Sequence, residues 1–248
     1  MEVNIIHNCD NLELMPQLVD NSIDVILTDP PYGLTQNIWD KKISFEVIWK
    51  EFKRLLKPNG IIIIFACEPF ASYLRLSNQE WYKYDIVWYK KTCSGFLNAK
   101  KQPLRCHELI SVFYKKQPTY NPQFTTRKHL RDFSNVEMKP HSSNFGKQRN
   151  YKSSITPDSP AYPRSVVEIT GVVGNSHEKT KHPTQKPIRL MEYLIQTYSN
   201  VGDIVLDPFS GSGSTAIACI NSSRKYICCE INKEYYDISI NRINTLKL

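Results

Sequence analysis

One short segment places a carboxylate, two prolines and an aromatic ring in consecutive positions, Asp29-Pro30-Pro31-Tyr32. The mostly apolar run of residues 24–28 precedes it and predicts a buried strand. Because proline lacks a backbone donor and has a fixed φ, neither a helix nor a strand continues through Pro30-Pro31. We therefore expect Asp29 and Tyr32 on a stiff turn at the carboxyl end of a strand, the edge at which open α/β sheets bind ligands.

The chemistry of this segment suits an amino group attached to a nucleotide base. Asp29 offers a carboxylate acceptor and the Pro30 carbonyl a second one, while Tyr32 offers a flat face on which a base can stack. Two acceptors on one exocyclic NH2 also draw its nitrogen out of conjugation with the ring, which makes it a better nucleophile. The alternative is an ordinary Pro-Pro turn followed by a core tyrosine.

A second candidate site is the loop of residues 207–215, Asp-Pro-Phe-Ser-Gly-Ser-Gly-Ser-Thr, which follows a predicted strand and opens a predicted helix. Its glycines allow the backbone to approach a ligand closely. Glu230, 17 residues beyond Gly213 at the end of the next strand, suits a ribose diol. A nicotinamide dinucleotide is disfavoured, because the third glycine of its fingerprint is missing and Asp207 would repel a pyrophosphate. Asp207 would instead attract the ammonium of an amino-acid moiety, as in S-adenosylmethionine; a plain turn with a solvated Glu230 is the alternative.

The elements that must position these groups alternate along the chain. Apolar runs predict strands, and apolar residues at helical spacing predict helices, so we expect an α/β fold with a mostly parallel sheet covered on both faces. The predicted strands are residues 3–7, 24–28, 61–66, 84–89, 109–114, 165–169, 204–207 and 226–229. The predicted helices are residues 12–18, 45–56, 70–76, 187–198, 214–220 and 232–245.

Residues 115–164 lack this periodicity and contain six prolines. They form too long a connection for a compact domain, which indicates a functional insert or a disordered one. Positive charge is concentrated in the same part of the chain: residues 90–189 hold 19 Lys and Arg against 6 Asp and Glu. Aromatic residues lie among these charges, as expected of a nucleic-acid surface, although a solvated insert is the alternative.

The composition narrows the class of protein further. A chain of 248 residues suits one large α/β domain or two small ones. No apolar run is long enough for a membrane span, and no signal pattern precedes the first strand. Seven cysteines are scattered without a C-x-x-C pair, which argues against zinc and predicts reduced, mostly buried thiols. We therefore expect a cytoplasmic protein without a bound metal and without a membrane partner.

Taken together, the two motifs resemble those of the DNA amino-methyltransferases. The order of the motifs, with the catalytic tetrapeptide before the cofactor loop, is similar to the β group of that family. Three further segments also look like family segments, so the resemblance covers nearly the whole chain: residues 57–61, 86–90 and 182–187. The pair of motifs in this order is highly specific, whereas either motif alone is not.

The resemblance implies a Rossmann-like methyltransferase fold with S-adenosylmethionine as cofactor. Residues 1–114 and 165–248 would form the catalytic domain, with a catalytic half at 1–114 and a cofactor half at 182–248, and residues 115–164 would recognise the target. The implied catalytic residues are Asp29, Pro30, Pro31 and Tyr32. The implied cofactor residues are Asp10, Thr184, Lys186, Asp207, Pro208, Phe209, Ser210, Gly211, Ser212, Gly213, Ser214 and Glu230.

Individual roles follow from the same resemblance. Glu230 would bind the cofactor's ribose, Lys186 would lie near its methionine carboxylate, and Asp10 near its adenine. A helix N-cap is an equally good interpretation of Asp10. Ser214 departs from the usual threonine but keeps the hydroxyl, and His182 is assigned no chemistry.

The implied reaction is methyl transfer to the exocyclic N6 of adenine in double-stranded DNA, with the target base flipped out of the duplex. No Pro-Cys pair is present, which argues against attack on carbon 5 of cytosine. Family members with aspartate at the position of Asp29 mostly modify adenine, and N4 of cytosine is the alternative target. A non-catalytic DNA-binding protein with a degenerate cofactor pocket, a nicotinamide oxidoreductase and an RNA methyltransferase remain as other readings. A homodimer and a partner restriction endonuclease, as in restriction-modification systems, are left open.

Overall fold

The computed structural model describes residues 1–33, 44–125 and 160–246. It divides into two compact units, Met1–Asn121 with Arg164–Leu248, and Pro122–Pro163. Most of the predicted target-recognition insert, residues 126–159, lies outside the described residues. In the described part of the second unit, Thr125 pairs with Ala161 in an antiparallel bridge, and the rings of Phe124 and Tyr162 lie 5.0 Å apart.

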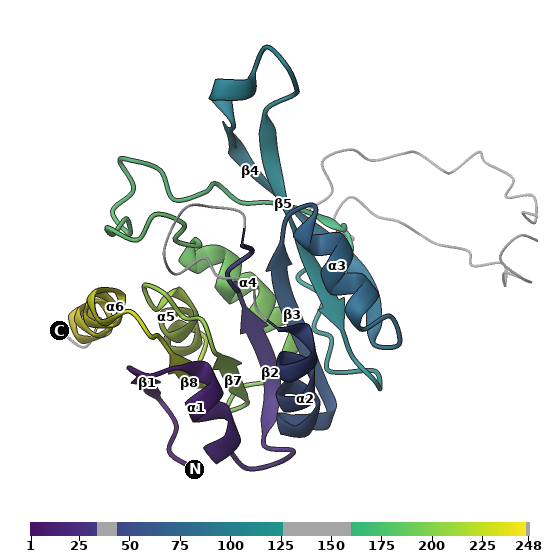
Figure 1. Cartoon of the computed structure of the whole chain (residues 1–248), viewed down its shortest axis with the longest axis vertical. Helices are drawn as coiled ribbons and strands as arrows, with labels where there is room; N and C mark the ends of the chain where they lie inside the picture. Colours follow the sequence, from purple (N-terminus) through teal and green to yellow (C-terminus); the bar gives the residue numbers. More distant parts are fainter. Residues whose placement is uncertain (34–43, 126–159, 247–248) are drawn as a thin grey trace, which may run out of the picture. The chain divides into compact units, whose positions relative to one another are not determined.

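The first unit is built on an eight-stranded sheet with the order β1-β8-β7-β2-β3-β5-β4-β6 (Figure 1). The first five strands in that order run parallel, β5 is antiparallel to both β3 and β4, and β6 is parallel to β4. This confirms the prediction of a mostly parallel sheet. In chain order the strands are β1 (Ile5–His7), β2 (Ile23–Thr28), β3 (Leu56–Ala66), β4 (Tyr82–Ser94), β5 (Arg105–Phe113), β6 (Val166–Glu168), β7 (Ile204–Asp207) and β8 (Lys225–Cys229).

Helices cover both faces of the sheet, as the sequence predicts. Neighbouring residues of the central strands belong to different cores: Val25 and Leu27 pack on one side and Ile26 on the other. This explains why β2 and β3 read as continuous apolar runs rather than as alternating patterns. One core receives α4 (Ile188–Tyr198), α5 (Ser214–Asn221) and α6 (Lys233–Thr245), and the other receives α1 (Asn11–Leu14), α2 (Phe45–Leu55) and α3 (Phe70–Ser77).

The sheet reverses its direction of growth between β2 and β7. From β2 the chain continues through α2 to β3 on one side, and from β7 it continues through α5 to β8 on the other. The two strands are adjacent and parallel, with Ile26 opposite Leu206. Ligands of open α/β sheets bind in the crevice at the carboxyl ends of such a strand pair. Asp29 and Asp207 are both located at this point.

Two local predictions need correction. The hairpin of β4 and β5 is longer than the predicted strands 84–89 and 109–114, because its outer part is polar and exposed and lacks an apolar signal. The expectation that all cysteines are reduced is wrong: Cys93 and Cys106 face each other across this hairpin and form a disulfide, with Cα atoms 4.2 Å apart. The other five cysteines are free. Among the described residues, no helix combines the length and apolarity needed to cross a membrane.

Candidate active site

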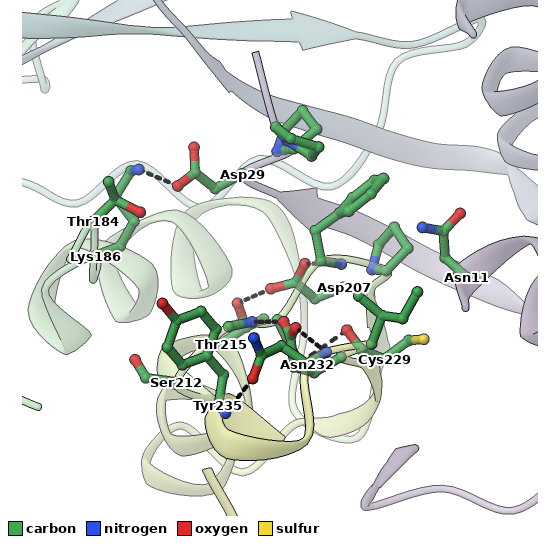
Figure 2. A pocket seen from close by; sticks show the side chains of 18 of the residues that line it. Asn11, Asp29, Thr184, Lys186, Asp207, Ser212, Thr215, Cys229, Asn232 and Tyr235 are labelled. Carbon is green, nitrogen blue, oxygen red and sulfur yellow. Dashed lines mark hydrogen bonds and ion pairs between the residues drawn. The ribbon is translucent and has the colours of Figure 1, made fainter. Parts of the chain in front are cut away.

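A cavity of about 1050 Å³ opens at the carboxyl ends of β2 and β7 (Figure 2). Both predicted motifs open onto it, although they are separated by most of the chain. The predicted site residues that line it are Asp10, Asp29, Pro30, Pro31, Tyr32, Thr184, Lys186, Asp207, Pro208, Phe209, Ser210, Gly211, Ser212, Ser214 and Glu230. Gly213 is absent from the lining.

The turn after β2 holds Asp29 and Tyr32 in direct contact. The Tyr32 hydroxyl donates a hydrogen bond of 2.6 Å to Oδ1 of Asp29. The Tyr32 ring packs against Phe70 of α3, with centroids 4.9 Å apart. Burial, reinforced by the charge of Asp29, raises the pKa of Tyr32 well above its usual value, so the phenol stays protonated and remains a donor. The turn therefore presents its carboxylate in a fixed orientation.

Lys186 forms an ion pair with Asp29 and connects it to a second carboxylate. Its Nζ contacts Oδ2 of Asp29 directly (Figure 2). It also lies 3.5 Å from Oε2 of Glu108 on β5. Glu108 in turn is paired with Lys90 on β4. The side chains of Lys186, Asp29 and Glu108 are only 8%, 20% and 16% exposed. Four charges of alternating sign thus extend from the turn after β2 to the β4–β5 hairpin.

The environment shifts the pKa of each central member of this cluster. Burial raises the pKa of Asp29, and Lys186 counteracts that shift. Burial acts to lower the pKa of Lys186, but the two carboxylates outweigh it and raise the pKa. Burial acts to raise the pKa of Glu108, but Lys186 and Lys90 together lower it. The environment therefore favours the protonated form of Asp29 and the charged forms of Glu108 and Lys186.

Glu108 and Lys90 were not among the predicted site residues. Their signal in the sequence is weak, because one charged residue in a strand usually faces solvent. Lys186 was predicted from the resemblance, but at the methionine carboxylate of the cofactor. In the structure it contacts Asp29 instead.

The glycine loop is shaped by Gly211 and Glu230. The amide of Gly211, at φ +51°, donates to Oε2 of Glu230 at 2.8 Å, and the amide of Asn232 donates to Oε1 at 2.8 Å. A Cβ on Gly211 would lie 2.8 Å from Nε2 of His182. The absence of a side chain therefore lets the loop and His182 approach each other closely. Glu230 is held by two backbone donors at the wall of the cavity.

Asp207 joins the two central strands to the start of α5. It accepts hydrogen bonds from Thr28 Oγ1 at 2.8 Å and from the Phe209 amide at 3.1 Å, and it contacts the Thr215 hydroxyl. Burial raises its pKa to about 6, although these donors oppose the shift. Asp207 therefore holds the loop to β2 as well as lining the cavity, where the sequence predicted only an attraction for an ammonium group.

The remaining predicted residues have mixed placements. Asp10 caps α1 by accepting a hydrogen bond from the Leu12 amide at 2.8 Å, and it also lines the cavity. The structure is therefore compatible with both interpretations of Asp10, the helix N-cap and the cofactor residue. Gly213 is the N-cap of α5 at φ +78°, where an added Cβ would lie 2.8 Å from Cβ of Ser239, so its role here is close packing. Ser214 Oγ donates to the Lys186 carbonyl at 2.8 Å and joins the loop to the segment that carries Lys186.

His182 and several other lining residues complete the walls. The His182 ring packs against Tyr235 with centroids 4.4 Å apart, and burial lowers its pKa to about 4, which keeps it neutral. Among the described residues, no group of three or more His, Cys, Asp or Glu is arranged to hold a metal ion. The lining residues that sequence analysis did not name include Asn11, Leu12, Val47, Ile48, Met191, Ile231, Asn232 and Tyr235.

Comparison with known proteins places the chain in one group. A sequence model of the family described as DNA methylase (N6_N4_Mtase) matches residues 23–241. The type II methyltransferase M.HpaI of Haemophilus parainfluenzae is 32% identical over 253 residues, which cover 96% of this chain and 73% of that protein. The DNA adenine methyltransferase YhdJ of Escherichia coli (strain K12) is 33% identical over 261 residues, covering 97% and 82%. The crystal structure of the M1.HpyAVI–SAM complex superposes with a TM-score of 0.63 at 27% identity, covering 96% of this chain and 98% of that one.

Proposed function

Because the chain belongs to the N6/N4 DNA methylase family, whose cofactor is S-adenosylmethionine, we propose that it methylates the exocyclic N6 of adenine in double-stranded DNA. The observation that carries this proposal is the meeting of Asp29-Pro30-Pro31-Tyr32 and the glycine loop at one cavity. A transferable methyl group and an activated amine must be brought together at one point. In the proposed site the glycine loop would hold the cofactor that carries the methyl group, and the turn after β2 would hold the amine.

The cavity fits the cofactor. Its volume of about 1050 Å³ lies at the upper end of the range for small-molecule pockets, which leaves room for a target base beside the cofactor. Gly211 keeps the loop free of a side chain, and the Glu230 carboxylate, held by two amides, has acceptor capacity left for the two hydroxyls of a ribose. Asp10 would face the adenine. The bound cofactor would supply an electrophilic methyl group attached to a sulfonium.

The catalytic turn would hold the amino group that accepts this methyl. The Asp29 carboxylate and the Pro30 carbonyl would accept its two N–H donors, and the Tyr32 ring would stack on the base. Extruding a base costs a few kcal/mol. Stacking on an aromatic ring contributes about 1–3 kcal/mol per base in single-strand systems and offsets much of that cost.

The ion pair with Lys186 must rearrange when the base enters. In the structure Tyr32 donates to Oδ1 of Asp29, and Lys186 occupies Oδ2. An incoming amino group therefore competes with Lys186 for the carboxylate. Glu108, 3.5 Å from the ammonium, offers a second carboxylate toward which Lys186 can move without losing its counter-charge. Lys186 would also be available to the cofactor's carboxylate after that movement.

Adenine is the proposed target for two reasons. Aspartate at the first position of the catalytic tetrapeptide is typical of adenine enzymes in the family that the motifs resemble. A DNA adenine methyltransferase is also 33% identical over 97% of the chain. N4 of cytosine is the second candidate, since its amino group would make the same contacts with Asp29 and Pro30.

The experiment combines a transfer assay with analysis of the product. Purified protein is incubated with labelled S-adenosylmethionine and duplex DNA, and the DNA is digested to nucleosides. We expect label in N6-methyladenine. Label in N4-methylcytosine would show that cytosine, and not adenine, is the target base. Cofactor binding without transfer to any DNA would favour the non-catalytic alternative.

The Asp29→Ala variant tests the catalytic assignment. It should abolish transfer while calorimetry still detects cofactor binding, because Asp29 is assigned to the base rather than to the cofactor. Asp237→Ala is the control, since Asp237 is an exposed carboxylate paired with Lys233 on α6. Normal turnover of Asp29→Ala would contradict the assignment.

A further inference from the structure

The β4–β5 hairpin extends beyond the rest of the sheet (Figure 1). Its tip carries two exposed apolar side chains. The tip comprises residues 95–104. Phe96 is 68% exposed, and Leu97 is fully exposed. A single exposed leucine is ordinary, but an adjacent Phe-Leu pair at the end of a projecting hairpin indicates a contact surface.

The tip is a built turn rather than a loose loop. Gly95 adopts φ +88° and leads into a 3-10 turn, Phe96–Asn98. The amide of Asn98 donates to the Gly95 carbonyl at 2.9 Å, and the amide of Lys101 donates to the Asn98 carbonyl at 2.8 Å. Immediately below, the Cys93–Cys106 disulfide joins the two strands. The apolar pair is therefore held outward before any partner arrives, which lowers the entropic cost of binding.

The charge around the pair is of one sign. Between residues 91 and 105 the sequence contains four cations and no acidic residue. Lys100, Lys101 and Arg105 are all exposed. Phosphates attract such cations, and apolar side chains between flanking cations are the chemistry of proteins that unstack DNA bases. A second protein with an apolar patch would not require the cations.

The base of the same hairpin forms part of the active-site wall. Glu108 on β5 lines the cavity and lies opposite Trp88 on β4. Ser94 is six residues beyond Trp88, so the end of the strand lies roughly 20 Å farther out at 3.3 Å per residue. The minor and major grooves are about 7.5 Å and about 8.5 Å deep, so this reach is enough to enter the duplex from which a base in the cavity has been extruded.

We propose that the hairpin tip is a DNA wedge: Phe96 and Leu97 insert into the base stack beside the extruded nucleotide, while Lys100 and Lys101 contact phosphates. The inserted side chains replace the stacking that the neighbouring bases lose. The proposal rests on the proposed function, because it takes duplex DNA as the substrate. In this proposal the hairpin tip opens the duplex, and Tyr32 stacks on the extruded base.

The first experiment separates base extrusion from the other steps. The Phe96→Ser/Leu97→Ser variant is assayed on a duplex carrying the methylation site, and on the same duplex with an abasic site opposite the target. We expect kcat/KM to fall at least about tenfold on the fully paired duplex and by less than about threefold on the duplex with the abasic site. The reason is that an unpaired base needs little help to leave the stack. Cofactor binding should be unchanged. Leu76→Ser, at a 63% exposed position on α3, is the control.

Equal losses on both duplexes, or no loss on either, would overturn the wedge. A change of oligomeric state in sedimentation, confined to the Phe96→Ser/Leu97→Ser variant, would show that the tip contacts a second copy of the chain instead. A wild-type protein that transfers no methyl group would refute the proposed function and not the wedge.

The second experiment is therefore independent of transfer. Lys100→Ala/Lys101→Ala should weaken duplex binding in fluorescence anisotropy and reduce the slope of log affinity against log salt by about 1.8, at about 0.9 for each lost phosphate contact. Lys225→Ala/Lys233→Ala, which removes two exposed lysines near the other edge of the sheet, should leave the slope unchanged. An unchanged slope in the Lys100→Ala/Lys101→Ala variant would overturn the phosphate contacts.

Discussion

Replacing Lys186 with methionine is the sharpest test of the buried charge cluster. Lys186→Met keeps an unbranched, largely apolar side chain of similar length and removes the ammonium. Two carboxylates, Asp29 and Glu108, then remain beside the cavity with side chains 20% and 16% exposed. Glu108 keeps its pair with Lys90, whereas Asp29 keeps only the hydrogen bond from Tyr32. The variant therefore isolates the value of Lys186 as a counter-charge.

The expected loss of stability is large. Removing one partner of a buried ion pair costs about 3–5 kcal/mol, because the other charge is left uncompensated. For a chain of this size, about 1 kcal/mol lowers Tm by about 2–4 °C, so the variant should unfold roughly 6–20 °C below the wild type. The matched control, Lys233→Met, removes a lysine that is 68% exposed and paired within α6. Such a pair contributes about 0.3–0.5 kcal/mol, so its Tm should barely change.

The pH dependence gives a second readout with a definite sign. Burial already raises the pKa of Asp29 and only Lys186 opposes it strongly, so removing Lys186 raises that pKa further. The folded variant then binds a proton that the unfolded chain does not, and its stability falls as pH rises. The deficit relative to wild type should therefore be larger near pH 8 than near pH 5.

Thermal unfolding followed by circular dichroism, without cofactor, measures both effects. The double variant Lys186→Met/Asp29→Asn should recover much of the loss, since it neutralises Asp29 and keeps the pair of Glu108 with Lys90. A Lys186→Met variant that unfolds at the same temperature as Lys233→Met at every pH would refute the interpretation of Lys186 as the counter-charge of Asp29.

Two further predictions concern the glycine loop. Burial raises the pKa of Asp207 to about 6. Between about pH 4 and pH 6 the folded protein therefore binds a proton at Asp207 that the unfolded chain lacks. The contribution of Asp207 to the free energy of unfolding falls as pH rises through that window. Asp207→Asn removes this dependence, and its Tm relative to wild type should increase from pH 5 to pH 8; a pH-independent difference would contradict the burial effect. Gly211→Ala would place a Cβ 2.8 Å from Nε2 of His182 at φ +51°, whereas Gly202→Ala at φ +86° would meet nothing within 4 Å. In calorimetry only Gly211→Ala should weaken S-adenosylmethionine binding, by at least about tenfold, and equal affinities would show that the close approach is unimportant.

Features encoded locally could be predicted from the sequence. The continuous apolar run of β3 marks a strand buried on both faces, and Pro30-Pro31 marks the end of β2 regardless of what packs nearby. The glycine loop is recognisable because glycine itself permits the backbone conformations and the close approach that such a loop requires. For the same reason, most predicted element boundaries lie within two or three residues of the observed ones.

Pairings between distant residues could not be predicted in the same way. The Cys93–Cys106 disulfide depends on the register of a hairpin whose outer part has no apolar pattern. Glu108 becomes a site residue only because β5 runs antiparallel beside β3, which brings its side chain to Lys186. No local property of a glutamate in a strand reveals that. Lys186 carried a recognisable motif, but its partner in the structure is set by the packing of three separate segments.

The sheet order explains why the distance between the motifs along the chain does not matter. Thr28 and Asp207 are 179 positions apart and share a hydrogen bond of 2.8 Å, because β2 and β7 are the adjacent strands from which the sheet grows in opposite directions. The turn after each strand then opens into the same crevice whichever strand comes first in the sequence. A catalytic segment that precedes the cofactor loop is therefore as well placed as one that follows it. What the arrangement does require is that each strand end abruptly, and Pro30-Pro31 and the Asp207 carboxylate enforce this on their respective sides.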